Sequence, residues 1–351
     1  MVAKMTIGNR VVGGGEPCFI IAEAGVNHNG DLQMAYDLVE AAVASGANAV
    51  KFQTWITEKV CKPGARKAEY QESGCPDEAD QFSMLKRLEL PYAWHGELKM
   101  HAERLGIIFL STPDEIQSAR FLCDLGIPAI KIGSGELTNL PFLRQVAALS
   151  RPLILSTGMG SLDDVRHAMA AIQSVRQIPV TLLHCVSAYP APEAEMNLQC
   201  IATLRREFGV PVGLSDHTTA NLAATIAVGL GMDILEKHLT LSHKLSGPDH
   251  AASAEPDEFA ELVRTVRRAE LMLGTGIKIP AASEISTRQA VQRTLLYARD
   301  LPAGHILAAE DMESLRCGLE GLPPDAATRV TGRTLCKAIH AGTAVVESDL
   351  E

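Results

Sequence analysis

The sequence predicts an α/β fold, an eightfold (β/α)8 TIM barrel, followed by a small β-rich module. Short apolar runs rich in β-branched residues alternate eight times with segments of helical period. The 351 residues exceed the roughly 250 of such a barrel by about a hundred. The alternation also stops after Ile279. We therefore expect a barrel over residues 1–278, a linker over 279–290 and a separate module over 291–351.

The expected strands and helices alternate along the first three quarters of the chain. The strands begin at Cys18, Asn48, Gly106, Ala129, Pro152, Val180, Val212 and Ile234, and helical segments cover 32–44, 97–105, 162–175, 198–208, 219–230 and 258–273. Strands that alternate with helices pair in parallel, and eight such units can close into a barrel. An open doubly wound sheet is expected to carry a glycine fingerprint after its first strand, and AEAGVNHNG is not GxGxxG.

The C-terminal module contains an internal repeat. AGHILAAEDM from Ala303 aligns with AGTAVVESDL from Ala341 at an offset of 38 residues. Chance similarity between two hairpins would also explain two copies, but we favour a β-rich module with internal pseudo-symmetry.

Composition and charge restrict the partners and the compartment. The formal net charge of −10 gives no general attraction to nucleic acid or anionic lipid. Residues 1–17 are polar and glycine-rich, without the apolar core of a signal peptide, and no stretch approaches the ~20 apolar residues of a spanning helix. The eight cysteines form no CxxC pair. We expect a cytoplasmic protein that binds neither nucleic acid nor a membrane.

Polar side chains gather where each predicted strand ends, which is where barrel enzymes place their active sites. Each residue alone has an ordinary explanation, because strand-end lysines often reach solvent and strand hydroxyls are often satisfied in the core. Together, two lysines and several hydroxyls predict a basic pocket for a phosphate and a carboxylate. The residues concerned are Lys51, Thr112, Lys131, Ser134, Ser156 and Ser215, with Glu23, Gln53, Glu136, Tyr189 and Glu236 nearby.

Two histidines are candidate metal ligands. His217 and His238 end adjacent predicted strands on the inward phase, so both imidazoles can face one point in the barrel mouth. A histidine pair is more often not a metal site, but this placement favours a divalent ion. The long segment over 55–91 is either a lid or a surface insertion, and the sequence does not separate the two.

The motifs in this order resemble the sialic acid (N-acetylneuraminate) synthase family, including legionaminic and pseudaminic acid synthases. They are FIIAEAGVNHNGD, AVKFQT, KIGSGELTNLP, LSTGM, HCVSAYPAP, GLSDHT, EKH and GPDH, and LRCGLEGL in the tail is similar to that family's antifreeze-like (SAF) domain. The resemblance implies condensation of phosphoenolpyruvate with an N-acetylmannosamine-type aldehyde, with loss of phosphate by C–O cleavage. It also implies a divalent ion, Mn²⁺ or Mg²⁺, and a domain-swapped homodimer.

The resemblance further implies roles for individual residues. Phosphoenolpyruvate would bind Lys51, Thr112, Lys131, Ser134, Ser156, Ser187 and Ser215, and the metal would bind His217 and His238. The amino sugar would contact Glu23, Gln53, Tyr189, Asp249 and, from the partner's C-terminal module, Arg316. Lys51 and Lys131 would act in catalysis, and either Glu23 or Glu136 would relay protons.

Some positions depart from the family's usual pattern. Ser187 stands where sialate synthases typically have Asn, and this serine, like the KAEYQ run from Lys67, resembles legionaminic or pseudaminic acid synthases. A 2,4-diacetamido trideoxyhexose is therefore an alternative acceptor. Asp114 replaces a common Phe and is expected to touch no assigned group. Another phosphoenolpyruvate-condensing 2-keto-acid synthase, a metal-dependent aldolase, and a non-enzymatic carbohydrate- or ice-binding module are the competing interpretations.

Overall fold

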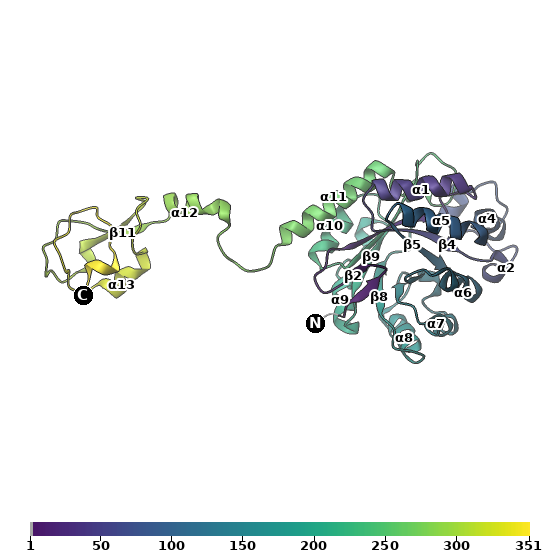
Figure 1. Ribbon diagram of the computed structural model, residues 1–351, viewed down its shortest axis with the longest axis horizontal. Helices are drawn as coiled ribbons and strands as arrows, with labels where there is room; N and C mark the ends of the chain where they lie inside the picture. The colour runs from purple at the N-terminus through teal and green to yellow at the C-terminus, as the bar shows by residue number, and fades with distance from the viewer. Residues whose placement is uncertain (1–2) are drawn as a thin grey trace. The chain divides into compact units, whose positions relative to one another are not determined.

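The computed structural model describes residues 3–351 and divides into two compact units. The first reaches Gly274 and the second spans Thr275–Glu351 (Figure 1). Each unit is described by itself below. None of the helices within residues 3–351 is long and apolar enough to cross a membrane.

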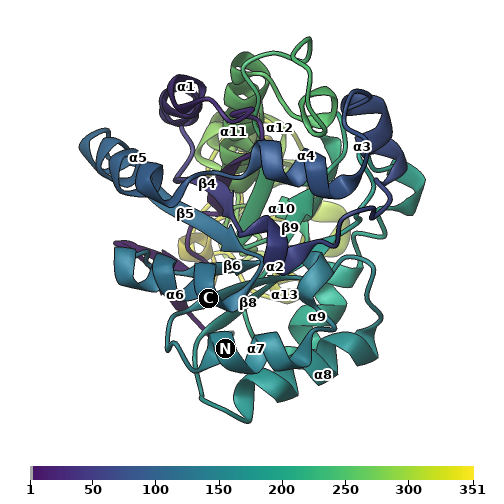
Figure 2. The ribbon, with the colours of Figure 1, turned by 90° about the vertical axis from the view of Figure 1, so that its right-hand side faces the viewer.

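The first unit is a nearly closed barrel of eight parallel strands (Figure 2). They are β3 (Phe19–Gly25), β4 (Ala49–Thr54), β5 (Ile108–Pro113), β6 (Ile130–Ile132), β7 (Leu153–Ser156), β8 (Val180–Cys185), β9 (Val212–Asp216) and β10 (Ile234–His238). The hydrogen-bonded order is β5-β4-β3-β10-β9-β8-β7-β6, and β5 and β6 at its two ends lie side by side. The predicted fold class is confirmed.

Eight helices follow the strands and cover the outside of the barrel (Figure 2). They are α1 (Leu32–Ala44), α5 (Tyr92–Arg104), α6 (Ile116–Leu125), α7 (Leu140–Ala147), α8 (Leu162–Gln173), α9 (Cys200–Phe208), α10 (Leu222–Gly229) and α11 (Pro256–Leu273). Val50 and Phe52 of β4 point outward and pack in the apolar layer between strands and helices. Ala49 points inward and packs inside the barrel.

The inward-facing positions change from apolar to polar along each strand, which fixes where chemistry can occur. Because side chains alternate along a strand, Lys51 and Gln53 share the inward phase of Ala49, and Glu236 and His238 share that of Ile234. The same change runs from Ile21 to Glu23, from Leu110 to Thr112, from Ala129 to Lys131 and from Ile154 to Ser156. The polar ends all lie at the C-terminal mouth of the barrel.

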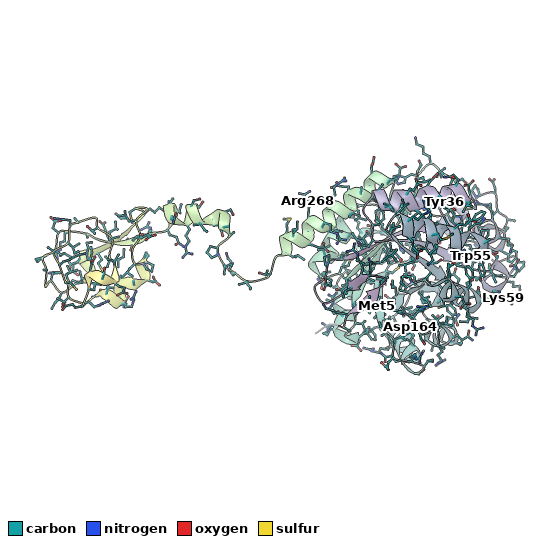
Figure 3. The ribbon with its side chains drawn as sticks, viewed as in Figure 1. Met5, Tyr36, Trp55, Lys59, Asp164 and Arg268 are labelled. Carbon is teal, nitrogen blue, oxygen red and sulfur yellow. The ribbon has the colours of Figure 1, made fainter. Side chains whose placement is uncertain are left out.

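A short hairpin closes the opposite end of the barrel. β1 (Met5–Ile7) and β2 (Arg10–Val12) pair antiparallel. Met5, which is labelled in Figure 3, is buried together with Ile7 and Val12 against the apolar starts of the strands. The N-terminal end is therefore filled with side chains.

The segment between β4 and α5 folds over the barrel mouth. It contains α2 (Thr57–Val60), α3 (Glu69–Gly74) and α4 (Gln81–Leu88). Its own small core consists of Trp55, which is labelled in Figure 3, with Cys75, Met84 and Leu88, and it packs with Val26. The segment is thus a packed substructure and not a loose insertion.

The second unit has the predicted internal repeat. It contains α12 (Ile285–Val291), β11 (Thr294–Tyr297), β12 (Met312–Leu315) and α13 (Ala327–Val330). The Tyr297 N–H donates to the Thr343 carbonyl, and 38 positions later the Leu335 N–H donates to the His305 carbonyl. Leu301 and Ile339, also 38 apart, exchange backbone hydrogen bonds with each other. The repeat is therefore structural, which confirms the pseudo-symmetric interpretation.

Candidate active site

The polar ends of the strands surround a cavity of about 340 Å³. The predicted residues that line it are Glu23, Lys51, Gln53, Thr112, Lys131, Ser134, Ser156, Ser187, Tyr189, Ser215, His217 and His238. Three larger hollows, of about 810, 650 and 580 Å³, carry none of the strand-end residues. The chemistry therefore belongs to the smaller cavity.

The two lysines are joined by one carboxylate. Lys51 Nζ lies 2.6 Å from Glu23 Oε2 and 3.7 Å from Glu236 Oε2, and it donates to Thr112 Oγ1 at 2.7 Å. Lys131 Nζ lies 3.3 Å from Glu236 Oε1, which also accepts a hydrogen bond from Ser215 at 2.9 Å. The sequence analysis noted Glu236 but gave it no role. Its position between the lysines depends on the pairing of distant strands.

These two carboxylates of the cavity differ in charge. Burial raises the pKa of Glu23, against the opposing effect of Lys51. Burial by itself would also raise the pKa of Glu236, but Lys131 and Lys51 outweigh it and hold that pKa well below its usual range. Glu236 is therefore ionised and serves as a fixed counter-ion, whereas Glu23 can take up a proton near neutral pH.

Several polar groups in the cavity remain available to a ligand. Among residues 3–351, Lys131 makes only long polar contacts, at 3.3 Å to Glu236 and 3.4 Å to the carbonyl of Ile132. Ser156 Oγ is buried and has no hydrogen-bond partner among the described residues. Buried polar groups are normally paired, so this hydroxyl marks a position where a ligand oxygen or a water belongs. Gly158 N–H donates to Ser134 Oγ at 3.0 Å.

Gly158 is required by this close packing. A Cβ atom at this position would lie 2.3 Å from Ser187 Oγ and 2.8 Å from Ser134 Oγ. Any side chain would therefore displace two hydroxyls that line the cavity.

The two histidines meet in the cavity as predicted, with ring centroids 5.5 Å apart. His217 Nδ1 lies 2.7 Å from the Val186 carbonyl, and because a carbonyl only accepts, Nδ1 carries a proton and Nε2 is the nitrogen that can offer a lone pair when the ring is neutral. His238 Nδ1 is buried without a hydrogen bond and lies 3.6 Å from Asp249 Oδ2. Burial and the neighbouring His217 lower the pKa of His238, so this imidazole is neutral.

Two imidazoles with available lone pairs fit an open divalent metal site. Within residues 3–351, no group of three or more His, Cys, Asp or Glu side chains is arranged to hold a metal ion. An ion here would therefore take its remaining ligands from water or substrate oxygens, as Mg²⁺ and Mn²⁺ readily do.

Three predicted site residues do not line the cavity. Glu136 lies beyond Ser134, and its carboxylate accepts a hydrogen bond from Asn139 at 2.6 Å. Asp249 is buried behind His238. Arg316 is exposed in the second unit. Their predicted roles stay predictions.

Other cavity residues were assigned no role from the sequence. Asp114 lines the cavity with the lysines, contrary to the expectation that it touches no assigned group. Burial and the Glu136 carboxylate raise the pKa of Asp114 to about 7, against the effect of Lys51 and Lys131. The remaining contributors are Ala68, Tyr70, Gln71 and Gln81 from the segment over the mouth, together with Gly133, Gly135, Met159 and Cys185. No periodic pattern marks the segment's residues, because they reach the cavity through tertiary packing.

Fold and site together are typical of a barrel enzyme with its polar cavity at the C-terminal mouth. The chain belongs to the NeuB family, which matches residues 38–278, and the SAF domain matches residues 292–351. The predicted family and enzyme class are confirmed.

Similar proteins cover nearly the whole chain. It is 44% identical to the N,N'-diacetyllegionaminic acid synthase of Legionella pneumophila, over 98% of this chain and 99% of that protein. It is 33% identical to the N-acetylneuraminate-9-phosphate synthase of Mus musculus, over 97% and 95%. Among solved structures, an N-acetylneuraminic acid synthetase from Leptospira borgpetersenii in complex with citrate matches with a TM-score of 0.72 and 34% identity, over 83% and 98%.

Proposed function

We propose that the protein is a nonulosonic acid synthase, which condenses phosphoenolpyruvate with the open-chain aldehyde of an N-acetylated amino sugar and releases phosphate. The observation that carries this proposal is the pair Lys51 and Lys131, held at one point by Glu236 and surrounded by the hydroxyls of Thr112, Ser134, Ser156, Ser187 and Ser215. Lysines and hydroxyls suit a ligand with one phosphate and one carboxylate. The named activities of the relatives support it.

The proposed reaction forms one carbon–carbon bond and breaks one carbon–oxygen bond. The enol carbon C3 attacks the aldehyde, water adds at C2, and the C2–O bond to phosphorus breaks so that phosphate leaves with the bridging oxygen. Lys51 and Lys131 hold the phosphate and carboxylate and stabilise the charge that develops on them. Gln53, Tyr189, Asp249 and Arg316 are the proposed contacts of the sugar.

Of the two candidate proton relays, we favour Glu23. Its buried carboxyl lines the cavity, accepts a hydrogen bond from Gln53 at 3.0 Å and has a raised pKa. A general acid or base works best when its pKa lies near the operating pH. Glu136 does not line the cavity. Glu23→Gln should abolish turnover, whereas Glu136→Gln should retain most of it; the reverse result would exchange the two roles.

The proposal includes a divalent ion, Mn²⁺ or Mg²⁺, on His217 and His238. When bound, such an ion polarises the aldehyde oxygen as a Lewis acid. The chain's own part is to fix the two imidazoles, His217 through the Val186 carbonyl and His238 beside Asp249. Equilibrium binding of Mn²⁺ to the metal-free protein tests this assignment without any turnover.

The acceptor that we favour is a 2,4-diacetamido trideoxyhexose. The relatives named N,N'-diacetyllegionaminic acid synthase are 44% and 41% identical, compared with 33% for the N-acetylneuraminate-9-phosphate synthases. N-acetylmannosamine is the alternative. The ratio of kcat/KM for the two sugars decides between them.

Release of inorganic phosphate from phosphoenolpyruvate tests the activity. Phosphate should appear only with an amino-sugar acceptor and should stop when a chelator is added. Lys51→Met should abolish release, whereas Lys59→Met, which changes an exposed lysine of α2, should leave it unchanged (Figure 3). Release with erythrose 4-phosphate or arabinose 5-phosphate instead would indicate a different 2-keto-acid synthase. No release with any aldehyde would contradict the proposal.

We also propose a domain-swapped homodimer in which Arg316 of one subunit reaches the partner's barrel. Arg316 is exposed on the surface of the second unit. Mixed dimers of an Arg316→Ala chain with a Lys51→Met chain should recover activity that neither variant has alone. Absence of recovery would argue for sites completed within one chain.

All eight cysteines are free, which agrees with the cytoplasm as the proposed compartment.

A further inference from the structure

The segment over the barrel mouth contributes a side chain to the cavity that none of the roles above uses. Tyr70 of α3 lines the cavity next to Gln71. Its ring packs against Tyr189, with centroids 4.8 Å apart. Tyr189 in turn packs against His217 at 4.2 Å. Tyr70 therefore extends an aromatic wall from the segment to the proposed metal ligands.

The hydrogen bonds around Gln71 determine whether the Tyr70 hydroxyl donates to Gln71 or accepts from it. Gln71 Oε1 accepts from the Ala68 N–H at 2.9 Å and from Gln81 Nε2 at 3.2 Å. A backbone N–H only donates, so the carbonyl end of the Gln71 amide must face Ala68 and the NH₂ end must face Tyr70. Gln71 Nε2 then donates to the Tyr70 oxygen at 3.3 Å. The hydroxyl accepts from Gln71, and its own proton is left to donate elsewhere.

Hydrogen bonds and close packing hold α3 in place. The Gly247 N–H donates to the Gly74 carbonyl at 3.1 Å, and a Cβ on Gly74 would lie 2.5 Å from the Gly247 oxygen. Lys67 Nζ donates to the Glu78 carbonyl at 2.7 Å. The segment that carries Tyr70 is therefore held against the connection that carries Asp249, which fixes the hydroxyl relative to the cavity.

We propose that Tyr70 recognises an acetamido group of the sugar acceptor by donating its hydroxyl hydrogen to the amide oxygen. This inference rests on the proposed function. An acetamido group has a carbonyl that accepts, a planar amide and a methyl group, so it matches a fixed donor beside two aromatic rings. Burial raises the pKa of Tyr70, which keeps the donor protonated. Phosphoenolpyruvate has acceptor oxygens but neither an amide plane nor a methyl group to match the aromatic rings, so the proposal assigns Tyr70 to the acceptor.

Tyr70→Phe keeps the ring and removes only the donor. For a 2,4-diacetamido trideoxyhexose, we expect kcat/KM to fall roughly tenfold, the usual effect of losing one hydrogen bond to a neutral group. The KM for phosphoenolpyruvate should not change. Tyr36→Phe removes a hydroxyl that donates to Glu97 on the outer helices and is the matched control. Gln71→Glu should lower kcat/KM at least as much as Tyr70→Phe, because the new carboxylate accepts the hydrogen bond from the Tyr70 hydroxyl in place of the sugar.

Two sugar analogues, each with one acetamido group replaced by hydroxyl, complete the test. Tyr70→Phe should cost roughly tenfold with one analogue and nothing with the other, which identifies the group that Tyr70 binds. An equal cost with all three sugars, or an equal rise in the KM for phosphoenolpyruvate, would overturn the proposal. Turnover by the unmodified enzyme reports separately on the proposed function, since its absence would contradict that function before any variant is compared.

Discussion

A buried ion pair behind the two histidines should dominate the stability of the barrel mouth. Lys237 Nζ lies 2.9 Å from Asp216 Oδ2 and donates to the Thr218 carbonyl at 2.6 Å. The two side chains are 3% and 0% exposed. Asp216 Oδ1 also accepts from the N–H and hydroxyl of Thr218. His217 lies between Asp216 and Thr218, and His238 follows Lys237, so the pair anchors the backbone on which both imidazoles are mounted.

Replacing Lys237 with Met leaves the Asp216 carboxylate buried without its cation. Loss of one partner of a buried pair costs about 3–5 kcal/mol. Since 1 kcal/mol shifts the melting midpoint of a large domain by about 2–4 °C, Lys237→Met should lower it by about 6–20 °C. Arg166→Met breaks an exposed pair with Glu207, which water and salt already screen, and should leave the midpoint almost unchanged.

Calorimetry of the full chain measures these midpoints, and a double variant tests the cause. Adding Asp216→Asn to Lys237→Met removes the unpaired charge, so the double variant should be more stable than Lys237→Met alone. If the loss of stability in the double variant equals the sum of the losses in Lys237→Met and Asp216→Asn measured singly, the buried-pair reasoning is refuted. Mn²⁺ binding should also weaken in both Lys237 variants and not in Arg166→Met; unchanged binding would show that the pair does not position the imidazoles.

Three further predictions follow from the site and the second unit. His238→Ala should weaken Mn²⁺ binding by more than about tenfold, since even disturbing the outer partners of a metal ligand costs that much, and unchanged affinity would remove His238 from the site. The pKa of Asp114 is raised to about 7, so its charge appears beside the lysines above that pH; kcat/KM for phosphoenolpyruvate should fall as pH rises through 7, and Asp114→Asn should make this fall smaller. A fall of unchanged size in the variant would assign it to another group. Asp311 is buried, but the Ala308 N–H, His305 and Arg299 lower its pKa to about 2. Its stabilising effect is therefore complete above the ordinary carboxyl pKa and is lost as pH falls towards 2. Asp311→Asn should speed hydrogen exchange of β11 and β12 at pH 7, and equal exchange rates would contradict this.

The strand ends could be predicted because periodicity and barrel geometry act together. Once β4 is recognised as a strand, the alternation that buries Val50 and Phe52 outside must turn Lys51 and Gln53 inward. The hairpin that closes the other end could not be predicted in the same way. Its strands have three residues each, and only Met5, Ile7 and Val12 are apolar and buried, which is too short a run for a periodic signal.

Contacts between distant segments account for the rest of what the sequence left open. Glu236 was visible as an inward residue, but its contacts with both lysines depend on the register of β10 against β3 and β9. Tyr70 reaches the cavity only because α3 is fastened to the connection near Gly247. Local pattern thus determined which residues face inward, whereas packing determined which of them meet.

The carboxylates of the cavity explain how a barrel can bury two lysines before its substrate arrives. Two unpaired ammonium groups at this depth would each cost several kcal/mol of folding free energy. Glu236, whose pKa is depressed, pairs with both and offsets this cost. A permanent counter-ion alone would then repel an incoming phosphate and carboxylate. Glu23 and Asp114 reduce this repulsion, because their raised pKa values allow them to take up protons as the anion binds. The lysines are therefore paired in the free enzyme, and in the proposed reaction they would still be able to hold an anionic substrate.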